Sequence, residues 1–129
     1  MNIREFYRGK TVLLTGTTGF VGKVILEKFI RELDVKRIYV MVRPKKTMTI
    51  KERLDKEIFT SEVFSFMIKQ KSREFFEEKR SRVVPVAGDL VVDKLGLSPQ
   101  DRAELVRELD VIINCAASVN FDDPLLDAI

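Results

Sequence analysis

Residues 15–23, TGTTGFVGK, hold three glycines and a lysine, which is typical of a loop that binds phosphate groups. A nucleoside-triphosphate loop of the Walker type needs four residues between its first and last glycine, then lysine, then serine or threonine. Here five residues separate Gly16 from Gly22, and Val24 follows Lys23. Magnesium would lack its hydroxyl ligand, so the spacing favours a turn that binds a dinucleotide.

The residues on both sides of this loop predict a strand before it and a helix after it. Residues 11–15 are an apolar run rich in strand formers, and residues 20–33 carry apolar side chains at helical spacing. The two apolar stripes are Val21, Ile25, Phe29 and Leu26, Ile30, Leu33. In a dinucleotide site Gly16 would allow the tight turn, Gly19 would let the backbone approach a pyrophosphate, and Gly22 would let the helix pack closely. The amides and dipole of the helix N-terminus would face the phosphates.

The size and composition of the chain indicate a single soluble domain. It has 129 residues, of which 45% are hydrophobic and 33% charged. The sequence has no apolar run of membrane-spanning length and no secretory signal pattern. One cysteine excludes an internal disulfide and fits a reducing, intracellular compartment, and the absence of histidine argues against a zinc site.

The charge is unevenly distributed along the chain. Residues 36–82 hold 14 Lys and Arg against 7 Asp and Glu, whereas residues 83–129 hold 3 against 9. The simpler interpretation of the basic segment is a pair of solvated helices; the alternative is a basic rim beside a multiply charged phosphate ligand. Nucleic acid is not expected as a partner, because no recognition motif or interleaving of aromatic and basic residues is present.

Three further strands are predicted after the first helix. Residues 37–42 and 110–115 are nearly all apolar, as in strands covered on both faces. Residues 83–87 contain Pro85, which cannot donate a backbone hydrogen bond, so this strand belongs at an edge.

Helical patterns separate these strands. Residues 49–82 are predicted to be helical, with Ile50, Leu54 and Ile58, then Phe64, Met67 and Ile68, on apolar faces and Phe75 and Phe76 in a third short helix. Ser98 is expected as the N-cap of a later helix, with Leu105, Val106 and Leu109 on its buried side. Asp123 is expected to begin one more helix.

This alternation predicts an α/β fold, a Rossmann-type doubly wound parallel sheet with strand order 3-2-1-4, truncated after the fourth strand. Pro85 agrees with that order, because it places the third strand at the edge. Ligands bind such sheets at the carboxyl ends of the strands, at the switch point between the first and fourth strands where the strand order reverses.

Arg43 is the candidate that selects the cofactor. A site that prefers NAD has an acidic residue at the end of the second strand, but residues 39–48 contain none. Arg43 stands there instead, and its planar, permanently charged fork suits the 2′-phosphate of NADP. The alternative is a surface arginine at the end of a strand.

Three further candidates follow the third and fourth strands. Asp89 could accept a hydrogen bond from the adenine amino group while Leu90 packs on the ring; the alternative is a simple turn carboxylate. Ala116 and Ala117 are small enough to leave room for the cofactor. Cys115 is expected to be a buried small residue rather than a nucleophile, because no histidine could activate it.

Together these segments resemble a known family. TGTTGFVG matches the glycine loop of the extended short-chain dehydrogenase/reductases, and FYRGKTVLLTG, IYVMVRP, GDL, LGLS and IINCAASVNFDD resemble the N-terminal half of the fatty acyl-CoA reductases. The resemblance spans nearly the whole chain. It implies cofactor binding by Gly16, Thr18, Gly19, Phe20, Val21, Gly22, Arg43, Asp89, Leu90, Ala116 and Ala117. Thr17 and Cys115, which adjoin these residues, are also expected at the cofactor site.

The resemblance also implies an activity, the NADPH-dependent reduction of a long-chain fatty acyl-CoA to a fatty alcohol. The family's catalytic Tyr-x-x-x-Lys pair has no match, because neither Tyr7 nor Tyr39 is followed by lysine four residues later. Residues 1–129 are therefore expected to be the N-terminal, cofactor-binding half of a longer enzyme of the peroxisome or endoplasmic reticulum membrane, catalytically inactive alone. Two alternatives stay open: another extended reductase or epimerase, and a non-enzymatic NADP sensor.

Overall fold

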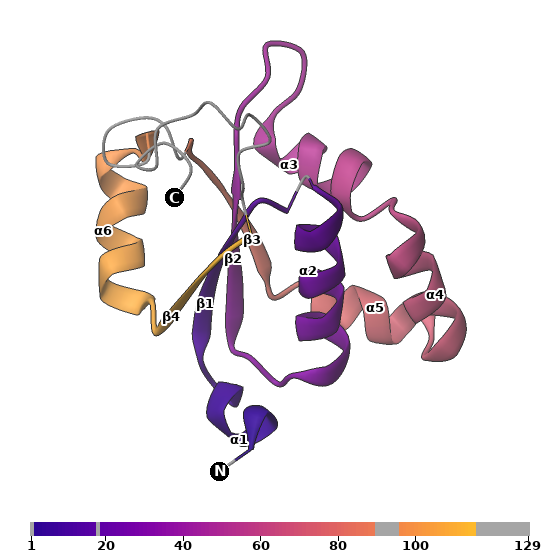
Figure 1. Ribbon diagram of the computed structural model, residues 1–129. Coiled ribbons are helices and arrows are strands. Elements are labelled where there is room, and N and C mark those ends of the chain that lie inside the picture. The colour runs from indigo at the N-terminus through magenta and orange to yellow at the C-terminus, as the bar shows by residue number, and fades with distance from the viewer. Residues whose placement is uncertain (1, 18, 90–95, 116–129) are drawn as a thin grey trace, which may run out of the picture.

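The computed structural model describes residues 2–17, 19–89 and 96–115, which form a sheet with helices on both faces (Figure 1). In chain order the elements are α1 (Ile3–Tyr7), β1 (Thr11–Thr15), α2 (Phe20–Glu32), β2 (Arg37–Val42), α3 (Ile50–Arg53), η1 (Leu54–Ile58), α4 (Glu62–Gln70), α5 (Arg73–Arg80), β3 (Val83–Ala87), α6 (Pro99–Glu108) and β4 (Val111–Asn114).

The four described strands are parallel and lie in the order β3-β2-β1-β4. Figure 1 shows α2, α3, α4 and α5 on one face of the sheet and α6 alone on the other. The order and the two-sided covering confirm the predicted doubly wound fold. Because the strands are parallel, their carboxyl ends lie at the same end of the sheet, and α1 lies beyond the opposite end (Figure 1).

Alternate residues of the strands build two separate cores, because successive side chains of a strand point to opposite faces. Val12 and Leu14 of β1 face the larger core, where the buried residues of α2, η1, α4 and α5 pack. Leu13 faces the smaller core with Tyr39, Met41 and the Leu105 side chain of α6. The uninterrupted apolar runs of β1 and β2 therefore reflect burial on both faces.

A polar network attaches α6 to the sheet. The hydroxyl of Tyr39, a fully buried residue of β2, donates to Glu104 Oε2 of α6 at 3.0 Å. Arg37 Nη1 donates to the same hydroxyl at 3.4 Å. Burial raises the pKa of Tyr39. The phenol thus stays protonated. It joins β2 to α6, the only helix on this face of the described sheet.

In two helices, one residue that was predicted to be buried is exposed. Val21, expected to share a buried stripe, is 60% exposed, because the buried side of α2 follows Gly22 and Leu26 instead. Val106, expected on the buried side of α6, is 72% exposed, because the helix packs through Leu105. In both cases the residue one position further or nearer along the helix is buried instead, and the valine side chain faces solvent.

The predicted helical region of residues 49–82 is divided into four helices. Its second member, η1, is a π-helix, in which the Phe59 amide donates to the Leu54 carbonyl at 3.0 Å, five residues back. Leu54 and Ile58 of this turn are buried in the larger core, as their spacing predicted. The sequence pattern gave the burial correctly but did not predict the change of helix type.

The two edges of the described sheet differ in protection. Val40 of β2 pairs with Pro85 of β3, as the edge position predicted. The Ile38 amide donates to the Arg82 carbonyl and the Gly88 amide to the Val42 carbonyl, so the ladder alternation turns Pro85 towards the open side. At the other edge, Ile112 of β4 is 64% exposed.

Candidate functional site

The loop after β1 is shaped by its glycines. Gly16 has a φ of 76°, in the left-handed region that favours glycine. The Gly19 amide donates to the Gly16 carbonyl at 3.2 Å, which closes the turn, and Gly19 is the N-cap of α2. Because Gly19 has no side chain to cap the helix, the amides of the first turn are left for another acceptor.

At Gly22, helix α2 packs tightly against the backbone of the loop. A Cβ atom on Gly22 would lie 2.1 Å from the Gly16 carbonyl oxygen and 2.7 Å from Thr17 Cα. Both contacts are with backbone, which cannot rotate away. A Cβ on Gly19 would lie 3.5 Å from the same oxygen, an ordinary contact. The role predicted for Gly22 is thus visible, with the loop backbone rather than a strand as the packing partner.

Thr17 carries a buried polar atom that fits a ligand-binding role. The residue is fully buried, and its hydroxyl has no hydrogen-bond partner within the described part of the chain. Buried hydroxyls are nearly always paired, and an orphan at a loop of this kind needs an explanation. The next residue, Thr18, lies outside the described residues.

Phe20 and Val21 open α2 and are both exposed. Their backbone amides belong to the first turn of the helix, where a helix N-terminus can bind a phosphate. Lys23, which follows the last glycine, is half-buried on the helix and its amide donates to the Gly19 carbonyl at 3.1 Å.

Arg43 and Asp89 meet at the ends of β2 and β3. Arg43 Nη1 lies 3.9 Å from Asp89 Oδ2, and the arginine side chain is 73% exposed. The two residues predicted to bind different parts of one adenosine thus lie side by side. Leu90, predicted to pack on the adenine ring, lies outside the described residues.

Sequence reasoning missed the residues that anchor this end of β2. Arg53 Nη1 donates to the Arg43 carbonyl, and Arg53 Nε donates to Glu57 Oε2 at 2.9 Å. Lys45 Nζ donates to both Glu57 oxygens, at 2.7 and 3.3 Å. The hydrogen bonds from Arg53 and then Lys45 lower the pKa of Glu57 to about 2. The i, i+4 spacing of Arg53 and Glu57 was a signal for their pairing, but nothing in the pattern tied the pair to Arg43.

The end of β4 is joined to the end of β1. The Cys115 amide donates to the Thr15 carbonyl at 3.1 Å, and the Thr15 hydroxyl donates to Asn114 Oδ1 at 2.7 Å. Cys115 is half-buried rather than fully buried as expected, and burial raises the pKa of its thiol. A raised pKa disfavours the thiolate, in agreement with a non-nucleophilic role. Ala116 and Ala117 lie outside the described residues.

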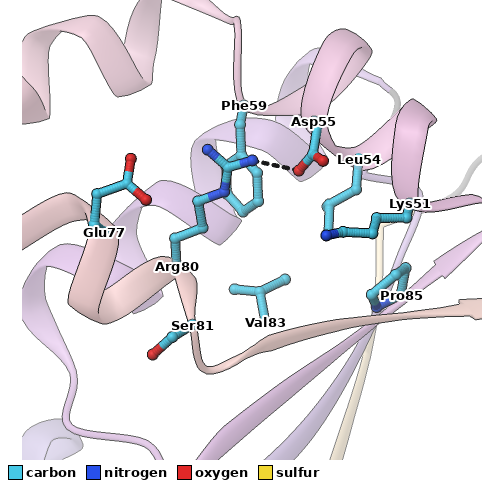
Figure 2. A pocket seen from close by; sticks show the side chains of 9 residues that line it. All are labelled: Lys51, Leu54, Asp55, Phe59, Glu77, Arg80, Ser81, Val83 and Pro85. Carbon is cyan, nitrogen blue, oxygen red and sulfur yellow. Dashed lines mark hydrogen bonds and ion pairs between the residues drawn. The ribbon is translucent and has the colours of Figure 1, made fainter.

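A hollow of about 320 Å³ lies away from this site, between the η1–α5 side and β3 (Figure 2). Its floor is apolar, with Val83 and Pro85, and Arg80 crosses it to pair with Asp55. The Arg80 guanidinium also lies 4.9 Å from the ring centre of Phe59. Because the Arg80 guanidinium already contacts the Asp55 carboxylate and the Phe59 ring, we assign no ligand to this hollow.

Other features of the described residues bear on the sequence expectations. Many cations of the basic segment are paired, among them Lys45, Arg53, Lys56, Arg73, Lys79, Arg80 and Arg82, which agrees with solvated helices. No group of three metal-ligating side chains occurs in the described ranges. Within the same ranges, no helix has the length and apolar character needed to cross a bilayer.

Comparison with known proteins agrees with this geometry. Residues 14–129 match the NAD-binding family described as male sterility protein. Fatty acyl-CoA reductase 1 of Mus musculus is 38% identical over 130 residues, which cover 100% of this chain and 24% of that protein. Fatty acyl-CoA reductase 2 of Bos taurus is 37% identical and also covered to 24%. The chain thus spans about a quarter of the length of these relatives.

A solved structure shares the fold. The terminal R domain from the myxalamid PKS-NRPS biosynthetic pathway superposes with a TM-score of 0.67 and 34% identity, covering 94% of this chain and 28% of that one. The superposition agrees with the parallel sheet described above. The match of most of the chain decides the family. This chain belongs to the male sterility protein family of NAD-binding domains, as its resemblance to the fatty acyl-CoA reductases predicted.

Proposed function

We propose that this chain is the NADPH-binding part of an alcohol-forming reductase that acts on long-chain fatty acyl-CoA. The observation that carries the proposal is the backbone cradle of Gly16, Thr17 and Gly22 at the end of β1, with Arg43 at the end of the neighbouring strand. The cradle suits a pyrophosphate, and the arginine suits a 2′-phosphate.

Each half of the cofactor has candidate partners. The uncapped amides at the start of α2 would hold the pyrophosphate, and the orphan hydroxyl of Thr17 is a further donor there. Arg43 would hold the 2′-phosphate, and Asp89 would accept from the adenine amino group. Bound NADPH supplies the hydride for the reduction of a carbonyl.

The proton for that reduction needs another source. Tyr7 packs edge-on against Phe29 near the opposite edge of the sheet, and the Tyr39 hydroxyl is bound to Glu104 under α6. Neither lies at the strand carboxyl ends. We therefore propose that residues 1–129 act as the N-terminal half of a dinucleotide domain, with the tyrosine–lysine pair supplied by sequence that the much longer relatives contain. An intracellular location at the peroxisome or endoplasmic reticulum belongs to the same proposal.

Calorimetric titration of the purified protein tests the cofactor. We expect binding of NADPH, weaker binding of NADH and no binding of ATP with magnesium. Tight binding of ATP–magnesium without a response to NADPH would disprove the dinucleotide site.

A second candidate substrate is an acyl thioester held on a carrier protein. It is favoured by the 34% identity with the R domain of a synthetase pathway. The identity with the acyl-CoA reductases is higher and extends over the whole chain, so we favour acyl-CoA. Turnover of the full-length enzyme with the same acyl group on coenzyme A and on a carrier protein distinguishes them.

A further inference from the structure

Lys45, Arg53 and Glu57, which we call the clasp, surround the backbone that carries Arg43. Arg53 is a buried charged residue, 8% exposed, at the end of α3. One nitrogen of its guanidinium donates to the Arg43 carbonyl and another to Glu57. The planar guanidinium holds both acceptors in a fixed geometry, whereas the ammonium group of lysine is a rotating point charge without that fork.

Glu57 joins the clasp to the loop. Its two oxygens accept hydrogen bonds from Lys45 Nζ, two residues after Arg43, while one of them also accepts from Arg53. The pKa of Glu57 is lowered to about 2 by these bonds, so the carboxylate is ionised at neutral pH. The segment that leaves β2 is therefore tied at two points to one helical turn.

That turn is firmly held by the core. Glu57 belongs to the π-helix η1, whose Leu54 and Ile58 are buried in the larger core. The helix before it starts at a capping box formed by Thr49 and Glu52. Between these supports the loop closes with a bridge between Lys45 and Met48. π-Helical turns are rare and frequently occur at functional sites.

The clasp also arranges the charges at this edge. Two cations, at positions 45 and 53, both pair with Glu57. Arg43 is not bound by Glu57 in any described contact; its side chain is exposed and faces Asp89 at 3.9 Å. The arrangement fixes the backbone of Arg43 and leaves its guanidinium at the carboxyl edge of the sheet.

We propose that Arg53 and Glu57 are positioning residues that act through Arg43 and set the preference for NADP over NAD. This rests on the proposed function, because it assumes that Arg43 binds the 2′-phosphate. Loosening the clasp weakens the contact with the 2′-phosphate and leaves the contacts with the rest of the dinucleotide unchanged. NAD lacks that phosphate, so its affinity is the internal reference.

The test measures dissociation constants of NADP⁺ and NAD⁺ by calorimetry for the purified full-length protein and its variants. Arg53→Lys keeps the net charge and loses the fork, and should lower the NADP⁺-to-NAD⁺ affinity ratio roughly two- to tenfold, the value of about one hydrogen bond. In an Arg43→Ala background the same change should leave the ratio unaltered.

Glu57→Gln separates positioning from bulk charge. It removes a negative charge, so an effect of charge alone would tighten NADP⁺ binding, whereas loss of positioning lowers the ratio. It also serves where Arg53→Lys fails to give a folded protein, as checked by circular dichroism and thermal melting.

The outcomes are distinct. An unchanged ratio, an equal loss with both cofactors, tighter NADP⁺ binding by Glu57→Gln, or a fall of the ratio that persists without Arg43 would overturn the positioning role. Wild-type protein that binds neither cofactor, or both equally, would overturn the proposed function and this inference with it.

Discussion

The two halves of the candidate site are built in different ways. At the end of β1 the shape is made by backbone, where Gly16, Thr17 and Gly22 approach each other so closely that a single Cβ would not fit. At the ends of β2 and β3 it is made by side chains, with an exposed Arg43 facing Asp89. The first half has no room for an added atom at Gly22, and the second half consists of charges on a tethered loop.

We expect the two halves of the site to recognise different parts of a dinucleotide. The pyrophosphate is common to all dinucleotides, and a cradle of backbone amides binds it whatever the rest of the ligand. The 2′-phosphate is the group that differs between NADP and NAD, and a replaceable side chain can select it. We therefore expect changes in the first half to affect stability and all cofactors, and changes in the second half to affect selectivity.

The largest effect is expected for Gly22→Ala. Its Cβ would lie 2.1 Å from the Gly16 carbonyl oxygen, so the loop or α2 must shift, at a cost of about 3 kcal/mol or more in unfolding free energy. Gly19→Ala is the matched control, because its Cβ meets only an ordinary contact and should cost about 1 kcal/mol at most. Urea unfolding compares them; equal stability of the two variants would contradict the close contact.

Arg43→Asp should act on selectivity with little change in stability. A charge-assisted hydrogen bond is worth roughly 1.5–3 kcal/mol, so the NADPH-to-NADH affinity ratio should change at least about tenfold, towards NADH. Titration with both cofactors measures it, with thermal melting as the control for folding. An unaltered ratio would mean that Arg43 points away from the cofactor.

The pH dependence of stability should report on Glu57. Its pKa is about 2 in the fold against an ordinary 4.5, so its contribution is present above pH 4.5 and is lost as the pH falls towards 2. Glu57→Gln removes this dependence. The stability gap between wild type and variant, measured by urea unfolding, should therefore be largest at neutral pH and narrow below pH 4.5. A constant gap would show that Glu57 is not held by Arg53 and Lys45 in solution.

The smallest effect is expected for Thr17→Val. The change keeps the side-chain shape and removes a buried hydroxyl that has no partner among the described residues, so stability should be unchanged or rise by up to about 1 kcal/mol. Thermal melting and NADPH titration separate two roles. A loss of affinity without a loss of stability would assign the hydroxyl to the cofactor, whereas a loss of stability would reveal a structural partner.

The fold and half of the site could be predicted from sequence because they depend on local patterns. The glycine spacing, the apolar strands and the position of Pro85 each follow from short-range rules, and the structure confirms the sheet order they predicted. Arg43 and Asp89 could be placed at strand ends, but their contact depends on the pairing of β2 with β3. The cofactor roles of these residues stay predictions.

The clasp could not be predicted because it depends on geometry that no local pattern encodes. Arg53 and Glu57 look like an ordinary surface pair of a helix, and only the π-turn of η1 and the return of the loop bring them to the Arg43 carbonyl. The prediction that Val106 is buried was wrong for a related reason. A valine beside Leu105 fits a helical stripe equally well, and only the docking of α6 on the sheet decides which of the two is buried.

The two edges of the described sheet differ in how readily they can pair with a further strand. Pro85 removes a hydrogen-bond donor from the outer side of β3, whereas β4 (Val111–Asn114) contains no proline and no charged residue that would prevent pairing with another strand. Another strand can therefore pair with the described sheet more readily at β4 than at β3. A strand of the same chain that pairs with β4 extends the domain, whereas a strand of a neighbouring copy that pairs there starts aggregation. These two kinds of pairing compete for the same edge of the sheet.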